Sequence, residues 1–487
     1  MSTRHLKGSL KLLSKKDLEN IHTSTLEILE KVGVRFTVAE AREVFSEAGF
    51  RVEKDVVKFK PKDIEDALKK APSRVLRKGL SSKWDVDLGD EKVYFGVGSL
   101  PIWVVESDYR RRKATYQDLL KFTLLSELLP NFSIGNGVVQ PQEIPNSVIH
   151  AIWNQNATIR MSKPSCCWYA KDFLVAEDGL RILEAAAGGK DELKRMKTWA
   201  ITICPDSALQ WGESVIGELV MAKAGVPIEI LPMPFCGSTH PVTIAGTLVQ
   251  GNAEALSALV LAQLINPGCP VIYAPSYGGI MDMATGAHSF GAPESALHAA
   301  AFAQLGKWYD LPTDMMMGTS DSKVPDGQAI ADKIITILLP ALAGADCITM
   351  AGGLLDFALS ASYEQLVIDD EIVGEIKRIL QGFEINKESL ATEVIKEVGI
   401  AGNYIASEHT CKNFRKEFYF PSLFDRTSWE KWEKEGKKDL LVRAKEKVSQ
   451  ILSSHFTLPS FLKEERVREV NRIVAEILKR EGVSEIT

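Results

Sequence analysis

The stretch MMMGTSDSKVPDGQA, Met315–Ala329, changes within a few residues from an apolar run to glycine and polar residues, and then to a helical pattern. An apolar strand that ends in this way before a helix is typical of α/β folds, in which ligands bind at the carboxyl ends of the strands. The stretch therefore predicts a strand-to-helix unit and a candidate functional edge.

Seven other short apolar runs of this kind occur in the chain, and each precedes a helical pattern. The eight runs are VYFGVG (93–98), SIGNGVV (133–139), SCCWYA (165–170), TWAITIC (198–204), IEILPM (228–233), PVIYAP (270–275), DMMMG (314–318) and DCITMAGG (346–353). The helical patterns begin near Tyr116, Asn146, Ala176, Ser207, Val242, Pro293 and Asp326, and after Tyr363. Unalternated apolar runs indicate parallel strands buried on both faces. Eight strand–helix units predict an α/β fold, a (β/α)₈ TIM barrel.

A doubly wound open sheet is the alternative arrangement of such units. That fold usually carries a glycine-rich phosphate turn after its first strand. The segment FGVGSLP has no G-x-G-x-x-G spacing, and no Walker A sequence occurs in the chain. These absences favour the barrel.

The segments on either side of the barrel differ from it in pattern. Residues 1–91 begin with a helix that Ser14 and Asp17 start as a capping box, and continue with short mixed segments, which predicts an N-terminal α/β cap. Residues 92–384 form the predicted barrel. Residues 385–487 contain aromatic and basic clusters and then helical patterns, which predicts a C-terminal helical extension that closes over the barrel.

Length and charge exclude several classes of protein. The 487 residues are enough for one large domain with additions, and the net charge of −6 is spread over mixed signs. The one dense basic run, Arg110–Lys113, is too short for a nucleic-acid footprint. The sequence has no uninterrupted apolar stretch of membrane-spanning length, and its N-terminus is polar, so we expect a cytoplasmic protein without a membrane partner. The 7 cysteines form no C-x-x-C spacing, which predicts free thiols.

The residues that follow the eight runs are expected to meet at one rim of the barrel. Aromatic rings there can hold a quaternary ammonium against their negative faces, although large rings also simply fill space. The candidate binding residues are Trp168, Tyr169, Phe235, Tyr277, His288, Phe357 and Glu364. The same rim is predicted to include Asn136, Gly352 and Gly353. Because Trp168 and Tyr169 are adjacent on a strand, at most one of them should face the cavity.

The histidines and cysteines do not form a recognised metal motif. Neither H-x-H nor H-E-x-x-H occurs in the sequence. The pair Cys166 and Cys167 suggests a zinc thiolate site, but adjacent residues of a strand diverge and buried thiols are common in cores. We therefore expect no bound metal, with a zinc-dependent methyltransferase as an alternative.

Three segments resemble the trimethylamine methyltransferase family, in its branch without pyrrolysine. They are GTSDSKVPDGQA (318–329), YGGIMDMATGAHSFGAPESAL (277–297) and HTCKNFRKEFYFPSLFDR (409–426). The resemblance implies a (β/α)₈ barrel that moves a methyl group from a methylated amine to the cobalt of a corrinoid, a cobalamin cofactor carried by a separate small protein.

The resemblance also implies a class of substrate. The branch without pyrrolysine includes enzymes that use glycine betaine and similar quaternary amines, so we expect glycine betaine as the methyl donor and dimethylglycine as the product. Proline betaine, carnitine and γ-butyrobetaine are alternatives, as is a non-catalytic betaine-binding protein. A quaternary nitrogen leaves as a neutral tertiary amine, so the protein would mainly position and desolvate its substrate.

Asp321 and Lys323 are the candidate catalytic residues. On the resemblance they would lie at the cavity mouth, where Co(I) meets the methyl group, and Lys323 is a candidate counterpart of the pyrrolysine. The alternative is that Asp321 caps the following helix and Lys323 pairs with it in solvent. At the same rim Asn136, Gly352 and Gly353 would face the corrinoid.

The corrinoid is expected to arrive on a cognate corrinoid protein. The string GAHSFG has Gly286 where the corrinoid-binding D-x-H-x-x-G motif has an aspartate before the histidine. MAGGLL (350–355) lacks the cysteine pair that a zinc-dependent betaine:homocysteine methyltransferase carries after its eighth strand. Docking should be transient, with Arg110, Arg111 and Arg112 contributing to the rim unless they lie in a solvated loop.

Two further expectations concern surfaces of the chain. The segment Phe414–Arg426 mixes aromatic residues and arginines, and it is predicted to brace the barrel or, alternatively, to line the docking face. We also expect the protein to form a homo-oligomer.

Overall fold

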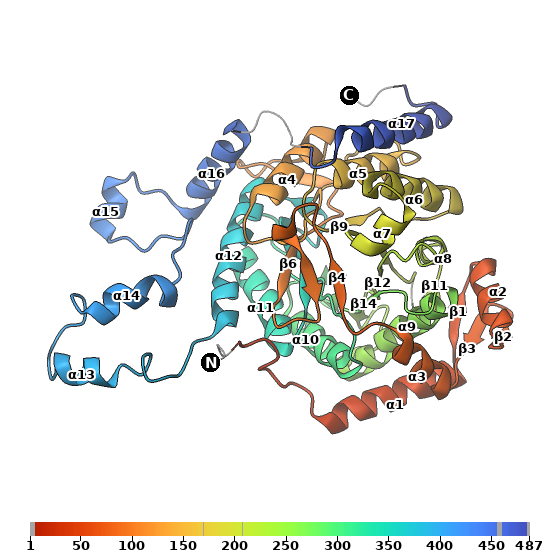
Figure 1. The fold of residues 1–487 in the computed structure, drawn as a ribbon, viewed down its shortest axis with the longest axis horizontal. Coiled ribbons are helices and arrows are strands. Elements are labelled where there is room, and N and C mark those ends of the chain that lie inside the picture. Colours follow the sequence, from red (N-terminus) through yellow and green to blue (C-terminus); the bar gives the residue numbers. More distant parts are fainter. Residues whose placement is uncertain (1–4, 169, 207, 455–459, 485–487) are drawn as a thin grey trace.

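A closed barrel of parallel strands, with helices outside it, forms the centre of the computed structural model, which describes residues 5–168, 170–206, 208–454 and 460–484 (Figure 1). Six positions of the barrel are strands: β6 (Tyr94–Val97), β9 (Ser165–Cys167), β10 (Trp199–Ile203), β12 (Ile228–Ile230), β14 (Val271–Tyr273) and β17 (Cys347–Gly352). Parallel pairing of β17 with β6 closes the ring. The predicted TIM barrel is therefore confirmed.

The second and seventh positions of the barrel are held by single bridges. Gly96 bridges to Ile134, and Tyr273 and Cys347 bridge to Thr313 and Asp314, all in parallel. These two runs do not form longer ladders, although both complete the ring. At the second position, the backbone of Gly135 lies close to the side chain of Met161. A Cβ added to Gly135 would collide with that side chain.

Each of the eight strand positions is followed by an outer helix. In order these are α4 (Tyr116–Leu128), α5 (Ile149–Ile159), α6 (Phe173–Ala187), α8 (Val215–Met221), α9 (Ile244–Ile265), α10 (Pro293–Trp308), α11 (Gly327–Ala343) and α12 (Tyr363–Gln381). The short α7 (Lys190–Met196) follows α6. Among the described residues, α9 is the one helix long and apolar enough to cross a membrane, but most of it is buried inside the protein. It is a core helix, packed against α1 (Lys15–Lys31) and α3 (Pro61–Lys70).

The N-terminal segment forms a small sheet. This sheet is attached to the barrel by a strand that occurs much later in the sequence. Strands β1 (Val34–Phe36), β3 (Val56–Lys58) and β2 (Arg51–Glu53) lie side by side, with α1, α2 (Ala39–Glu47) and α3 around them. β1 also pairs in parallel with β11 (Gln210–Trp211), which lies in the loop after β10. This pairing attaches the sheet to the carboxyl-end rim of the barrel.

A second hairpin, β4 (Val75–Arg77) and β5 (Val86–Leu88), places a cation at the opposite end of the barrel. The guanidinium of Arg77 is 1% exposed and donates to the carbonyl oxygens of Ser165, at 2.6 Å, and Thr198, at 3.2 Å. These residues lie at the amino ends of β9 and β10, so Arg77 closes the base of the barrel.

The arginine run lies in a small sheet at the carboxyl-end rim. β8 (Arg111–Lys113) pairs with β7 (Trp103–Val105), which joins β19 (Ser360–Ala361) and β18 (Leu354–Leu355). Arg111 approaches Asp356 at 3.2 Å, and Arg112 donates to Asp118 at 2.5 and 2.8 Å. Arg111 and Arg112 are therefore ion-paired, and neither lies in a free solvated loop.

The C-terminal segment, which was predicted to be a helical extension closing over the barrel, divides into an arm and two helices that pack on the outer helices. Helices α13 (Thr392–Val398), α14 (Glu408–Glu417) and α15 (Trp429–Lys434) stand away from the barrel as an arm (Figure 1). α16 (Leu440–Ser454) packs on α12 and α4, while α17 (Glu464–Arg480) packs on α5 and α6. The apolar face of α17 packs against α5 and α6.

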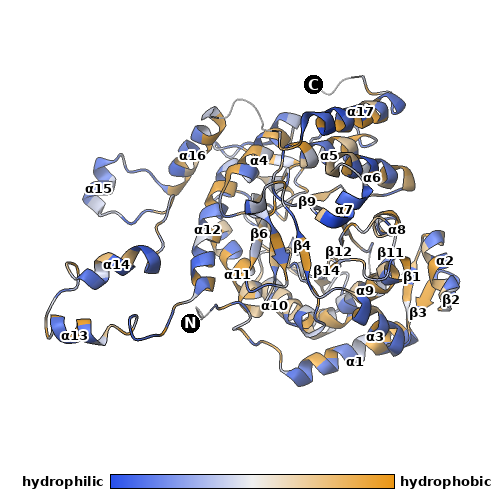
Figure 2. Cartoon of the chain, in the orientation of Figure 1, coloured by the Kyte–Doolittle hydropathy of each residue, from blue (hydrophilic) through white to orange (hydrophobic). Residues whose placement is uncertain are grey.

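The base of the arm is fastened to α12. Glu371 accepts hydrogen bonds from the Tyr419 hydroxyl at 2.9 Å, the Ser422 hydroxyl at 2.7 Å and the Leu423 amide at 2.8 Å. In Figure 2 α11 shows much orange, whereas α7 is largely blue, and the buried residues of α11 are mostly apolar. The apolar core therefore lies between the barrel and its helices.

Candidate active site

A cavity of about 640 Å³ opens at the carboxyl ends of the barrel strands. Every one of the eight strand positions contributes to its wall. The contributing residues are Val97, Ser99 and Leu100; Ile134 and Asn136; Cys166, Cys167, Trp168 and Lys171; Thr202, Cys204, Pro205 and Asp206; Leu231 and Met233; Tyr277; Met316; and Thr349 and Met350. This is the end of a TIM barrel at which ligands bind, so the cavity is the candidate active site.

The edge of the cavity is exposed to solvent. Thr37, Leu100, Lys171, Asp206 and Glu213 all line the cavity and are exposed, whereas the deeper lining residues are buried or half-buried. Thr37 directly follows β1, so the N-terminal sheet contributes to this edge. A reactant brought from outside can therefore reach the cavity from the rim.

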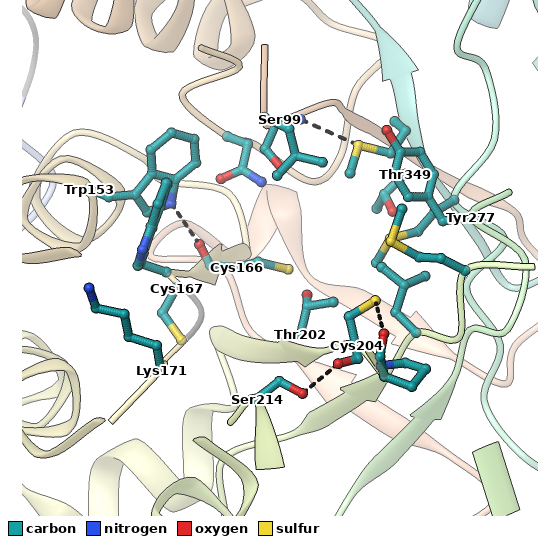
Figure 3. Close-up of a pocket in the computed structure, with 18 of the residues that line it drawn as sticks. Ser99, Trp153, Cys166, Cys167, Lys171, Thr202, Cys204, Ser214, Tyr277 and Thr349 are labelled. Atoms are coloured by element: carbon teal, nitrogen blue, oxygen red, sulfur yellow. Dashed lines mark hydrogen bonds between the residues drawn. The ribbon is translucent and has the colours of Figure 1, made fainter. Parts of the chain in front are cut away.

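Two tryptophans form one side of the cavity. Trp153, on α5, and Trp168, just after β9, have ring centroids 5.2 Å apart and ring planes inclined at 59°. The indole Nε1 of Trp153 donates to the carbonyl oxygen of Cys166, which fixes the ring (Figure 3). Two inclined indoles make an aromatic corner that suits a cation without N–H donors.

A buried pair of carboxyl groups lies behind the cavity wall. Glu229, in β12, is 0% exposed, and Asp314, at the seventh position, is 1% exposed. The Thr202 hydroxyl donates to Glu229 Oε2 at 2.6 Å, and the Thr349 hydroxyl donates to Asp314 Oδ2 at 2.7 Å. Burial, and then the neighbouring Glu229 carboxylate and a hydrogen bond with it, raise the pKa of Asp314 well above its usual value. Asp314 therefore favours the protonated form beside the Glu229 carboxylate.

The cavity thiols are protonated at neutral pH. Burial raises the pKa of Cys166 well above its usual value, and burial also raises the pKa of Cys167 and Cys204. Cys166 Sγ lies 3.5 Å from Glu229 Oε2, so the thiol donates toward the carboxyl pair. Thiols in this state are poor nucleophiles and poor metal ligands. Within the described ranges, no three His, Cys, Asp or Glu side chains gather to hold a metal ion.

Three of the predicted rim residues line the cavity. Trp168 forms the aromatic corner with Trp153, Tyr277 lies across the cavity from Trp153 (Figure 3), and Asn136 is 8% exposed. The Asn136 Oδ1 atom is buried without a hydrogen-bond donor among the described residues. Burial raises the pKa of Tyr277, which therefore presents a neutral phenol. Tyr169 lies outside the residues that the structure describes.

Phe235 and His288 lie next to each other but do not line the cavity. Their rings stack with centroids 4.1 Å apart, and Phe290 joins them to Tyr277, whose ring centroid is 5.0 Å from that of Phe290. His288 Nε2 lies 3.2 Å from the Ser238 hydroxyl. These two predicted residues therefore support the wall behind Tyr277.

Asp321 and Lys323 also lie outside the cavity lining. Asp321 accepts from the Phe290 amide at 2.8 Å and from the Ser289 hydroxyl. Lys323 is exposed, donates to the Asp321 carbonyl oxygen at 2.7 Å and lies 4.0 Å from the centroid of the Phe357 ring. The cap of α11 is Asp326, which accepts from the Ala329 amide at 2.9 Å. Asp321 thus ties two rim loops together and does not cap the helix.

The remaining predicted residues lie around the eighth strand, away from the cavity lining. Phe357 packs under Lys323, and Glu364 is 5% exposed and accepts from the Ser362 hydroxyl at 3.0 Å. The Gly353 amide donates to Asp369 at 2.7 Å, and the Gly352 carbonyl accepts from Gly98 at 3.1 Å. Their contacts are with the neighbouring strand, loops and α12.

Sequence reasoning missed three parts of the site. Trp153 was missed because it lies on a helix, whereas the candidates were taken from residues that follow strands. Glu229 and Asp314 interrupt apolar runs, and a carboxylate inside a buried strand is a signal that could have identified them. No local pattern marks Thr37, because its position depends on the pairing of β1 with β11.

Comparison with known proteins identifies relatives over nearly the whole chain. The profile of the family described as trimethylamine methyltransferase (MTTB) matches residues 2–481. A glycine betaine methyltransferase of Desulfitobacterium hafniense (strain Y51) is 34% identical over 446 residues, 91% of this chain and 92% of the relative. The trimethylamine methyltransferase MttB of Desulfitobacterium hafniense (strain DSM 10664 / DCB-2) is 36% identical over 97% of this chain and 95% of its own length.

A solved structure shares the fold at much lower identity. The crystal structure of the Methanosarcina barkeri monomethylamine methyltransferase covers 100% of this chain and 91% of its own, with 12% identity and a TM-score of 0.50. At this identity the likeness concerns the fold alone.

Proposed function

Because the chain belongs to the trimethylamine methyltransferase family, we propose that it transfers a methyl group from a quaternary amine, glycine betaine first, to Co(I) of a corrinoid carried by a partner protein. The family makes it a methyltransferase for methylamine-type substrates. The observation that carries the finer proposal is the corner formed by Trp153 and Trp168 inside a cavity at the barrel rim. We propose that the quaternary nitrogen binds there.

The chain's own residues would bind and orient the substrate. The indole faces of Trp153 and Trp168 attract the trimethylammonium group, and Met233, Met316 and Met350 add apolar surface elsewhere in the cavity lining. A bound corrinoid would supply the nucleophile for the methyl group, and the amine would leave with the electron pair of the broken C–N bond. The product is dimethylglycine, and its amine nitrogen is uncharged when it leaves. No group of the protein therefore has to protonate it.

The exposed edge of the cavity supports delivery of the methyl acceptor from outside. Thr37, Leu100 and Lys171 belong to this edge, and Asp206 and Glu213 complete it. The protein would receive the corrinoid from a docked partner at this rim. A homo-oligomer and a cytoplasmic location remain predictions.

Methyl transfer is tested with purified protein, a reduced corrinoid protein and a panel of methylated amines. The loss of Co(I) absorbance and the appearance of dimethylglycine are followed with glycine betaine, proline betaine, carnitine, γ-butyrobetaine and trimethylamine. We expect methyl transfer from glycine betaine and none from trimethylamine. Absence of transfer from every quaternary amine would refute the proposal, and tight betaine binding without product would identify a binding protein instead.

A zinc-dependent reaction is the second candidate function. It can be tested because three cysteines, Cys166, Cys167 and Cys204, line the cavity. Their raised pKa values oppose thiolate formation. Retention of activity after dialysis against a zinc chelator would exclude this reaction, whereas recovery on adding zinc would favour it.

A further inference from the structure

The hydroxyl groups of Thr202 and Thr349 present only lone pairs to the cavity. Each hydroxyl has a single proton, and both protons point to the buried carboxyl pair of Glu229 and Asp314, at 2.6 and 2.7 Å. The Thr349 amide also donates to Asp314, at 3.0 Å. The carboxyl pair therefore determines the orientation of these two hydroxyl groups. Figure 3 shows Thr202 and Thr349 in the cavity wall.

The carboxyl pair also carries charge. Burial, together with the Glu229 carboxylate, raises the pKa of Asp314, so one carboxylate charge lies behind the cavity wall. The pair is 0–1% exposed, so water screens this charge poorly. Within the described residues, Arg77, a buried cation at the base of the barrel, donates to the Ser165 and Thr198 carbonyl oxygens and forms no ion pair with either acid.

The side chain of Asn136, a third polar group in the cavity wall, is separate evidence for a ligand in this cavity. Asn136 lines the cavity, is 8% exposed, and its Oδ1 atom is buried without a donor in the described part of the chain. A buried acceptor without a donor is costly unless a ligand compensates it. A cation that offers polarised methyl groups compensates such an oxygen without an N–H donor.

Resting on the function proposed above, we infer that Glu229 and Asp314 make this cavity selective for a permanent cation, by placing negative charge behind it and turning the Thr202 and Thr349 oxygens toward the substrate. The pair acts through these hydroxyls and through its field, so both acids are positioning residues. The substrate class that follows is a quaternary ammonium compound, in preference to an uncharged molecule of the same shape.

Matched pairs of ligands separate charge from shape. Glycine betaine is compared with tert-butylacetate, in which carbon replaces nitrogen, and choline with neohexanol, its carbon isostere. Dissociation constants are measured by calorimetry for the wild-type protein and for the double variant Glu229→Gln/Asp314→Asn. We expect the wild-type preference for each cation to fall on the order of tenfold in the double variant, with little change in affinity for neohexanol, which carries no charge.

Glu218→Gln is the matched control. Glu218 is also 0% exposed and belongs to the outer helix α8, but it does not line the cavity. We expect the Glu218→Gln variant to prefer the cations over their isosteres as strongly as the wild-type protein does. Thr202→Val and Thr349→Val form a second test that leaves both acids in place, and we expect each to reduce the preference for the cation severalfold.

The outcomes separate this inference from the proposed function. A folded double variant that keeps the wild-type cation preference would overturn the inference, and so would unchanged preference in both valine variants if the double variant does not fold. Methyl transfer by such variants would leave the proposed function standing. If neither cation binds to the wild-type protein, the inference is refuted, and the methyl-transfer panel of quaternary amines decides the proposed function.

Discussion

Replacement of Trp153 by leucine is expected to weaken glycine betaine binding about thirtyfold. Trp153 is 4% exposed, and its ring lies 5.2 Å from that of Trp168, so a cation in the corner is shielded from water. A desolvated cation–π contact with tryptophan contributes about 2 kcal/mol, which corresponds to a factor of about thirty in Kd. Leucine keeps an apolar surface but has no negative ring face.

Calorimetry with Trp153→Leu measures this change, and tert-butylacetate distinguishes a lost cation–π contact from a damaged pocket. This isostere keeps the carboxylate but has no cationic nitrogen, so it should bind the variant nearly as well as it binds the wild-type protein. Trp429→Leu is the control, because Trp429 lies on the arm at 67% exposure. A folded Trp153→Leu protein whose Kd for glycine betaine changes less than about threefold would show that the corner does not hold the ammonium.

Three further predictions concern the rim and the ion pairs. Arg110→Glu, at an exposed position, should slow methyl transfer to the protein-bound corrinoid in stopped-flow absorbance without changing betaine binding; equal rates would remove Arg110 from the docking face. Lys333→Met should lower the free energy of unfolding in urea by about 3–5 kcal/mol, because it leaves Asp369, 3.0 Å away and fully buried, without its cation. Burial tends to raise the pKa of Asp118, but hydrogen bonds, the first from Arg112, lower it to about 2, so its contribution to stability is complete above about pH 5 and lost as the pH falls toward 2. Acid titration of Asp118→Asn should lack this component, and an unchanged profile would contradict it.

The barrel could be predicted because each of its strands is buried on both faces. Such strands appear in the sequence as unalternated apolar runs, and the helices between them carry local start signals such as Pro293 and Asp326. The C-terminal arm could not be placed in this way. Its orientation depends on distant contacts, including those of Tyr419 and Ser422 with Glu371, which no local pattern specifies.

The candidate site was predictable only in part, for a geometric reason. Position after a strand identifies the rim but not the direction of each side chain, so Trp168 and Tyr277 line the cavity whereas Phe235 and His288 stack behind it. Asp321 follows a strand too, but its oxygens are taken by donors of a neighbouring loop, including the Phe290 amide. Such pairings depend on the tertiary structure.

The pairing of β1 with β11 has a consequence for synthesis on the ribosome. Arg35 and Gln210, which face each other across this ladder, are 175 residues apart in the chain. At roughly 5–20 residues per second, β1 waits on the order of ten to thirty-five seconds before its partner is made. During that interval one edge of the N-terminal sheet is open to other chains, which is the condition under which strands mispair. Nascent chains that stall before residue 210 should therefore depend on chaperones more than chains that stall after it.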